Sequence, residues 1–127
     1  MQSTAFHFEK LTVYQRSLKF SLTIYTRTQS WPREHLFGIT DQLRRASLSI
    51  PLNIAEGYSR SRKDFQHFLT LSRGSCYECI PLIKISESLK LLTTKESEMF
   101  YNELKEISQM LSGLRSALSK NTLNPKL

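Results

Sequence analysis

The sequence predicts an all-α protein, an up-down-up-down antiparallel four-helix bundle, and three observations support this fold class. Apolar residues recur at spacings of three and four in four segments, which is the periodicity of helices with one buried side. Short turn signals separate these segments, so successive helices are expected to pack as antiparallel neighbours. The alternation of polar and apolar residues that marks a strand is not found. The 127 residues fit one domain, residues 1–127, with an ordered core over about 6–120 and a frayed tail over 121–127.

The first predicted helix begins near Leu11 and runs for about 17 residues. Its predicted buried stripe consists of Leu11, Tyr14, Leu18, Leu22 and Tyr25. A second helix is expected to start at Pro32, because proline suits the first helical turn, where its missing N–H is not needed. Its predicted stripe consists of Leu36, Ile39, Leu43, Ala46, Ile50 and Ile54. Gly57 is expected to end this helix in the left-handed conformation.

Two capping patterns predict where the third and fourth helices begin. Ser61 with Asp64 resembles a helix cap, and the third helix is expected to run from there to about Leu91. Its predicted inner side consists of Phe65, Phe68, Leu69, Ser72, Cys76, Cys79 and Ile83. Thr93 with Glu96 has the pattern of a capping box. The fourth stripe alternates spacings of four and three, as in a bundle seam, and consists of Phe100, Leu104, Ile107, Leu111, Leu114 and Leu118.

The chain carries an excess of positive charge, with a formal net charge of +7 and a sequence pI of about 9.7. Residues 1–73 hold 11 Lys and Arg against 5 Asp and Glu, whereas residues 74–127 hold 7 against 6. The charge therefore makes a polyanion a suitable partner, mainly for the first half of the chain.

The expected compartment is the cytoplasm, and no membrane association is expected. The start of the chain, MQSTAFHFEKLTV, lacks the features of a signal peptide, and no later stretch is apolar enough for a membrane span. The only cysteines, Cys76 and Cys79, give no disulfide framework, which suits a reducing compartment.

The sequence predicts no metal, no cofactor and no catalytic residue. Cys76 and Cys79 form a C-x-x-C pair, but zinc would need two further ligands, and both fall on an apolar stripe, so core packing is the favoured interpretation. Phosphate-binding loops, dinucleotide motifs and nucleophile elbows are missing from the sequence. An enzyme acting on a small-molecule substrate is therefore not expected.

Three segments carry a resemblance to a known family: FEKLTVYQRSL, WPREHLFGITDQLRRASLSIPLNIAEG and DFQHFLTLSRGSCYE. Together they resemble the four-helix bundle family that includes proteins encoded in intervening sequences of bacterial 23S rRNA genes. The similarity covers roughly residues 6–120. Its core signature, specific as a set, consists of Gln42, Leu43, Arg44, Arg45, Ala46, Ser49, Ile50, Asn53, Ile54, Ala55, Glu56 and Gly57.

The resemblance implies a homo-oligomer, with a pentameric barrel favoured, and no established enzymatic activity. A more distant relative in fold is the accessory variability determinant of diversity-generating retroelements, a basic pentameric bundle that works with a reverse transcriptase and RNA. This relative makes nucleic acid a candidate partner by analogy of fold. One departure from the family pattern is CYECIPLIKI, where Pro81 removes the N–H that would bond the Tyr77 carbonyl. A kink or break is expected near residues 77–81.

The residues interpreted as a structural or oligomer signature are Ser49, Pro51, Asn53, Glu56 and Gly57. Pro51 leaves the Ser47 carbonyl without its helical partner, and a bend there, beside small residues, would let helices approach closely. A strained ligand site is the alternative. Asn53 and Glu56 could cap freed backbone groups or bridge to a neighbouring chain, and Glu56 is expected to pair with Arg60 one turn later. Catalysis by Glu56 is not favoured, because no second acid, base or metal ligand accompanies it.

The predicted nucleic-acid-binding residues are Arg44, Arg45, Arg60, Arg62 and Lys63. Arg44 and Arg45 project away from the apolar stripe. They could contact a phosphate, or they could form salt bridges to another subunit. The other three crowd the start of the third helix, where the helix dipole disfavours cations. Free N–H groups there, together with the hydroxyls of Ser59 and Ser61, suit a phosphate.

The resulting hypothesis is a non-enzymatic homo-oligomer whose basic face binds nucleic acid, with structured RNA expected and the contacts mainly electrostatic. The alternative is a protein-interaction or structural scaffold without nucleic-acid binding, in which the same arginines make salt bridges to subunits or partners. The sequence leaves open which nucleic acid is bound, the biological process, and the subunit number apart from the resemblance.

Overall fold

The computed structural model describes residues 6–120, and the tail expected over 121–127 lies outside the described residues. The four helices are α1 over Thr12–Thr28, α2 over Asp41–Tyr58, α3 over Arg62–Ser88 and α4 over Thr94–Ser119. A 3₁₀ turn over His7–Lys10 precedes α1, and residues 6–120 contain no strand. The prediction of an all-α fold with four helices is therefore confirmed.

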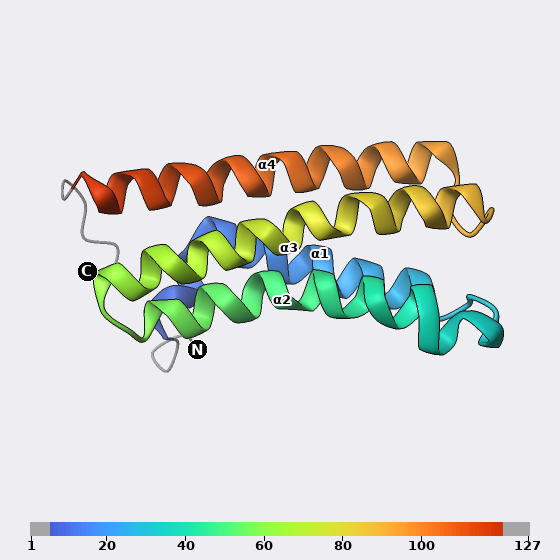
Figure 1. Cartoon of the computed structure of the whole chain (residues 1–127), viewed down its shortest axis with the longest axis horizontal. Helices are drawn as coiled ribbons and strands as arrows, with labels where there is room; N and C mark the ends of the chain where they lie inside the picture. The colour runs from blue at the N-terminus through green and yellow to red at the C-terminus, as the bar shows by residue number, and fades with distance from the viewer. Residues whose placement is uncertain (1–5, 121–127) are drawn as a thin grey trace.

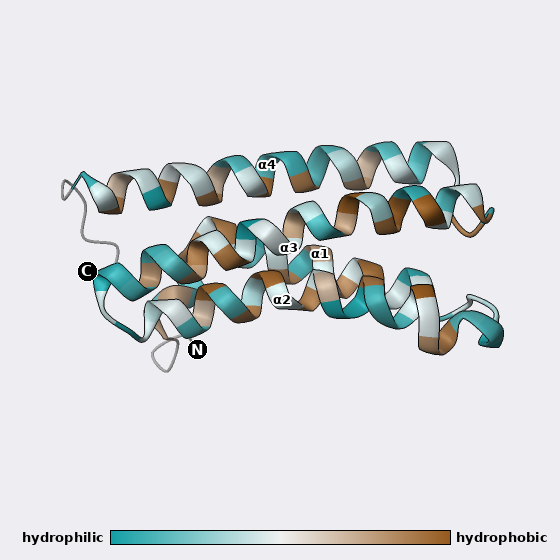
Figure 2. Ribbon diagram, viewed as in Figure 1, coloured by the Kyte–Doolittle hydropathy of each residue, from teal (hydrophilic) through white to brown (hydrophobic). Residues whose placement is uncertain are grey.

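Each helix packs against the next one along the chain, and α1 also contacts α4, which closes the bundle. Figure 1 shows the α2–α3 turn at the same end as the start of α1 and the end of α4. The α1–α2 and α3–α4 connections lie at the opposite end. Figure 2 shows hydrophobic and hydrophilic residues alternating along each helix, as expected for helices that bury one side. None of the helices within residues 6–120 combines the length and the apolarity needed to cross a bilayer.

The predicted stripes of the second, third and fourth helices form most of the core. The predicted positions that are buried are Leu43, Ala46, Ile50, Ile54, Phe65, Leu69, Ser72, Cys76, Cys79, Ile83, Phe100, Leu104, Ile107, Leu111 and Leu118. The predicted positions that are only half-buried are Leu36, Ile39, Phe68 and Leu114. Helical periodicity alone therefore located the inner side of these three helices.

The buried side of α1 differs from the prediction. Leu18, Leu22 and Tyr25 are exposed, and the residues that face the core are Val13, Ser17, Phe20, Ser21, Ile24 and Thr28. Two of these buried hydroxyls bond carbonyls of their own helix, from Ser17 Oγ to Tyr14 O at 2.9 Å and from Thr28 Oγ1 to Ile24 O at 2.9 Å. Hydroxyls with such hydrogen bonds are tolerated in a core. A search for regularly spaced apolar residues does not find them, because serine and threonine are polar.

The two ends of the second helix also differ from the prediction. Pro32 precedes a 3₁₀ turn over Arg33–His35, and a wider helical turn over Leu36–Thr40 leads into α2. Gly38 has φ −116° and ψ −114°, which are not helical dihedral angles, so one continuous helix cannot start at Pro32. At the other end, α2 runs to Tyr58, and Gly57 does not adopt the left-handed conformation.

Both predicted caps are confirmed. Ser61 Oγ accepts a hydrogen bond from the Asp64 backbone N–H at 3.2 Å, and Thr93 forms a reciprocal capping box with Glu96. The third helix ends at Ser88 and not near Leu91, because Lys90 has a left-handed φ of 67°.

Of the kink or break expected near residues 77–81, the break does not occur. α3 is one continuous helix from Arg62 to Ser88 with Pro81 inside it, and Figure 1 shows its ribbon uninterrupted. Pro81 and Tyr77 are both exposed, so water can solvate the Tyr77 carbonyl that proline leaves without a partner.

Candidate nucleic-acid interface

Arg44 and Arg45 lie in the first turns of α2, beside α1. Arg44 Nε donates to Thr28 Oγ1 at 2.7 Å, and its guanidinium lies 4.3 Å from the centroid of the Tyr25 ring. Arg45 is exposed, and within residues 6–120 no hydrogen bond or ion pair engages its side chain. Arg44 therefore helps to join α2 to α1, whereas Arg45 is accessible to a partner.

Arg60, Arg62 and Lys63 gather at the α2–α3 turn. Arg60 forms the predicted ion pair with Glu56, at 2.6 Å between Nη2 and Oε2. Arg62 Nη1 donates to the Leu118 carbonyl at 3.3 Å and so ties the start of α3 to the end of α4. Lys63 is exposed. The three cations therefore have different environments.

The five predicted nucleic-acid-binding residues do not form one site. Arg44 and Arg60 are 16 residues apart, which corresponds to about 24 Å along a helix. The predicted phosphate site at the first N–H groups of α3 is also weakened, because Ser61 Oγ already occupies the Asp64 N–H. The structure thus separates the arginines at the start of α2 from the cations at its end.

The polar signature residues of α2 bond within their own helix. Ser49 Oγ donates to the Arg45 carbonyl at 2.9 Å, and Asn53 Nδ2 donates to the Ser49 carbonyl at 2.8 Å. Asn53 therefore does not reach the Ser47 carbonyl that Pro51 leaves without its usual partner. Pro51 is buried within an α2 that runs without interruption, which favours its structural interpretation.

Two contacts bring α2 and α3 close together. Ser72 Oγ of α3 donates to the Ile50 carbonyl of α2 at 2.8 Å, in a buried position. Any Cβ added to Gly57 would lie 2.4 Å from Phe68 Cβ, far inside normal contact distance. Glycine is needed here to let a neighbouring helix approach and not to turn the chain.

Sequence reasoning missed a cationic surface between α3 and α4, close to the α2–α3 turn. We call it the α3/α4 groove; its volume is about 360 Å³ and its lining residues are Gln66, His67, Thr70, Arg115, Ser116 and Ser119. Arg115 Nη1 donates to Thr70 Oγ1 at 2.9 Å, and Lys63 precedes His67 by one turn. No acidic residue lines the groove. Arg115 is the only arginine in residues 74–127, where basic and acidic residues nearly balance. Its place in the groove is therefore visible only in the three-dimensional structure.

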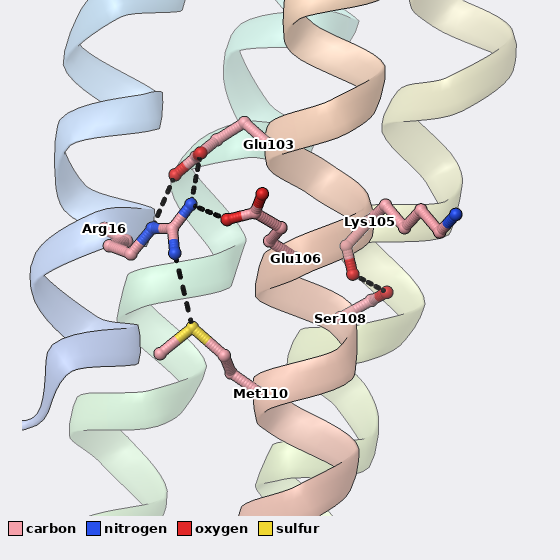
Figure 3. A network of polar contacts seen from close by, with 6 residues as sticks. All are labelled: Arg16, Glu103, Lys105, Glu106, Ser108 and Met110. Carbon is pink, nitrogen blue, oxygen red and sulfur yellow. Dashed lines mark hydrogen bonds and ion pairs between the residues drawn. The ribbon is translucent and has the colours of Figure 1, made fainter.

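Three of the four acidic residues of α4, Glu96, Glu103 and Glu106, bind arginines of α1. Figure 3 shows Arg16 between Glu103 and Glu106, with Arg16 Nη2 2.6 Å from Glu103 Oε1. The hydrogen bonds that Arg16 donates, to Glu103 first and to Glu106 second, raise the pKa of Arg16. In the same view Lys105 and Ser108 extend from the opposite side of α4, toward α3. None of these carboxylates lines the α3/α4 groove.

A second ion pair joins α1 to α4 near the start of α4. Arg27 Nε lies 2.6 Å from Glu96 Oε2, and Arg27 also donates to the Leu91 carbonyl at 3.1 Å. The hydrogen bond from Arg27 lowers the pKa of Glu96 to about 2. Both interhelical arginines of α1 are thus committed to the bundle itself.

An apolar surface remains exposed where α1 meets α2, and we call it the α1/α2 face. Its exposed apolar residues are Leu18, Leu22, Tyr25, Leu48 and Leu52. Tyr25 and Leu48 line one groove together with Asp41, Arg44 and Arg45. This surface combines large apolar side chains with charged residues at its rim, an arrangement common in protein interfaces.

Cys76 and Cys79 are buried, unpaired members of the core. Burial raises the pKa of the Cys76 thiol to about 12, and it raises the pKa of Cys79 as well. Among residues 6–120 no cluster of His, Cys, Asp and Glu could hold a metal ion. The arrangement supports packing as the role of this pair.

Comparisons with known proteins agree with the fold. The chain is similar to a crystal structure of a protein with unknown function from the S23 ribosomal protein family of Bacteroides thetaiotaomicron VPI-5482, with a TM-score of 0.75. The two are 24% identical, and the match covers 82% of this chain and 95% of the other. No curated protein matches the chain.

The family resemblance of the three sequence segments is confirmed by an independent match. The family pattern described as 23S rRNA-intervening sequence protein matches residues 9–113, which is most of the chain. The four helices fall largely within this range. The chain belongs to the family of 23S rRNA-intervening sequence proteins.

Proposed function

We propose that the protein is a non-enzymatic, nucleic-acid-binding bundle of the cytoplasm that works as a homo-oligomer. Phosphates would bind at the α3/α4 groove and at Lys63 beside it. The observation that carries this proposal is a cationic groove without acidic lining, next to the α2–α3 turn. The unpaired cysteines suit a reducing compartment.

The groove has the chemistry that a phosphate backbone requires. Arg115 supplies a guanidinium that can form two parallel hydrogen bonds to phosphate oxygens. Ser116 supplies a hydroxyl donor, a frequent phosphate contact, whereas the hydroxyls of Thr70 and Ser119 donate to backbone carbonyls of their own helices. Arg62 would contribute to the local field while it holds the end of α4.

The proposal is tested with the double variant Lys63→Gln and Arg115→Gln. Binding of a fluorescent RNA hairpin is measured by anisotropy between about 50 and about 200 mM salt. Removing two phosphate contacts should weaken binding and make the slope of log K against log salt shallower by about 1.5.

The matched control is Lys19→Gln with Lys95→Gln, which removes the same charge from exposed positions outside the groove. If the control weakens binding as much as the groove variant, only net charge matters and the proposed site is wrong. RNA binding that is absent, or indifferent to salt, contradicts nucleic-acid binding altogether.

The α1/α2 face supports a second candidate, the subunit contact of the homo-oligomer. Leu22 is 60% exposed and Leu52 is 57% exposed, although both are large apolar side chains. Pairing this face with another copy would remove them from water. The resemblance favours up-down-up-down bundles assembled into a pentameric barrel, and under the scaffold alternative Arg44 and Arg45 would border this contact.

The double variant Leu22→Gln with Leu52→Gln tests this second candidate by light scattering. The mass should fall toward that of the monomer, 14.8 kDa. Met99→Gln with Ile85→Gln is the control, because both residues are exposed and apolar but belong to other surfaces. An unchanged mass in the first variant places the subunit contact elsewhere.

A further inference from the structure

The surface between α3 and α4 continues beyond the groove and carries an exposed aromatic residue. Tyr77 is 56% exposed, and the guanidinium of Arg73 lies 4.8 Å from the centroid of its ring. Arg73 Nη2 also donates to the Tyr77 hydroxyl at 3.1 Å. The ring is therefore held in place by its neighbour while much of its surface faces water.

A second depression lies next to this aromatic ring. Its lining includes Tyr77, Tyr101, Lys105 and Ser108, and no acidic residue. Figure 3 shows the ammonium group of Lys105 reaching away from α4 on the side of α3. A cation, hydroxyls and two tyrosines thus share one stretch of surface.

The groove and this depression form one strip along the same side of α3. Lys63, Thr70 and Tyr77 are spaced at seven residues, which is close to two helical turns and keeps them on one side. The interval from Lys63 to Tyr77 is 14 residues, or about 21 Å along the helix. At about 3.4 Å per stacked nucleotide, the strip matches about six nucleotides.

We propose that this strip binds an unpaired stretch of nucleic acid, with phosphates on Lys63, Arg115 and Lys105 and a base stacked on Tyr77. The inference rests on the proposed nucleic-acid binding and restricts it to a single-stranded segment, such as a loop of a structured RNA. The bases of a duplex are already stacked on one another, so they cannot stack on Tyr77, and the exposed ring should add little to the affinity for a duplex. An acidic peptide would use the cations but would have no planar base to stack.

The experiment compares three fluorescent probes: a 12-nucleotide oligo-U, a 12-nucleotide oligo-dT and an RNA duplex of the same length. Tyr77→Ala should weaken binding of both single strands by about 5-fold or more, because base stacking is lost. Duplex binding and the salt slope should not change, because no charge is removed. Tyr77→Phe keeps the ring and should restore most of the affinity.

Phe37→Ala is the matched control, because Phe37 is 92% exposed and lies outside both depressions. Circular dichroism verifies that each variant keeps its helices. If RNA binds with a salt-dependent affinity but Tyr77→Ala leaves it unchanged, the inference is overturned and the proposed function stands.

Three other outcomes also overturn the inference. One is a duplex that binds as tightly as the single strands. Another is complete displacement of oligo-U by polyglutamate at equal charge, which would indicate an acidic peptide site. The third is no binding of any probe, which would remove the proposed function too. A difference between oligo-U and oligo-dT distinguishes RNA from DNA as the preferred single strand.

Discussion

Gly57 acts at the residue scale in one of the two roles that the sequence suggested: it lets two helices approach closely, and it does not end α2. Its position before a polar turn predicts a left-handed helix end, yet its φ is negative and α2 continues past it. What it provides is space, because Phe68 of α3 occupies the place where a Cβ would stand. A missing side chain here determines how closely two helices pack.

Replacing Gly57 with alanine should destabilise the fold. The new Cβ would lie 2.4 Å from Phe68 Cβ, so helix α2 or α3 must shift, and overpacking of this kind costs about 1 to 3 kcal/mol. The effect is measured as the change in the free energy of unfolding in urea.

Gly74→Ala is the control for this prediction. A Cβ at Gly74 would have nothing within 4 Å, so this change should stabilise α3 by about 0.5 to 1 kcal/mol. Equal effects of the two substitutions would show that helix propensity, and not the contact with Phe68, dominates at Gly57.

Other residue-level differences have a similar origin. The first helix was predicted with the wrong buried side because serine and threonine occupy core positions while Leu18 and Leu22 remain outside. Apolar periodicity identifies a buried side only where the core is filled by apolar residues. Of the predicted basic residues, Lys63 lies one helical turn before His67 of the α3/α4 groove. Arg115, which lines the groove, could not be linked to Lys63 from the sequence pattern.

At the scale of elements, helix starts were easier to predict than helix ends. Ser61 and Thr93 begin α3 and α4 because their side chains accept the first N–H groups, and this chemistry is visible in the sequence. The end of α3 depends on Lys90 in a left-handed conformation, for which lysine gives no signal. The start of α2 depends similarly on the irregular dihedral angles of Gly38.

Pro81 gives a prediction that belongs to α3 as an element. Pro81→Ala should stabilise the helix by about 1 to 3 kcal/mol, because it restores an N–H to bond the Tyr77 carbonyl and removes ring crowding. Thermal or urea unfolding measures the gain. Pro51→Ala should gain less, since the Pro51 ring is buried and its packing would be lost. A Pro81→Ala variant no more stable than the parent would mean that α3 has already relaxed around proline.

For the molecule as a whole, the contact between α1 and α4 relies strongly on charge. Arg16 binds Glu103 and Glu106, and Arg27 binds Glu96, whereas the neighbouring helix pairs pack mainly through apolar stripes. These ion pairs could not be predicted from the sequence, because the two partners of each pair are 69 to 90 residues apart. The four-helix fold itself was predictable, since it follows from three well-formed stripes and short turns.

The closure of the bundle should therefore depend on acid pH. The pKa of Glu96 in the folded protein is lowered from an ordinary value of 4.5 to about 2. Its contribution to stability is fully present above pH 4.5 and is lost as the pH falls toward 2. Unfolding free energies of Glu96→Gln and the parent should differ most near neutral pH and converge near pH 2. Glu98→Gln is the control, at an exposed position without an ion pair in residues 6–120, and its unfolding free energy should equal that of the parent at every pH. If the unfolding free energies of Glu96→Gln and the parent differ by the same amount at every pH, the lowered pKa of Glu96 is not the cause.

The same ion pairs affect how the molecule meets a charged partner. Two arginines and three glutamates leave a net charge of −1 along the seam of α1 and α4, so the rest of the chain carries a net charge of +8. The positive groups outside this seam include Arg115 and Lys105, which line the two depressions of the strip along α3. A polyanion would orient the bundle during diffusion, before any contact forms, and this steering should make the association rate fall steeply with ionic strength.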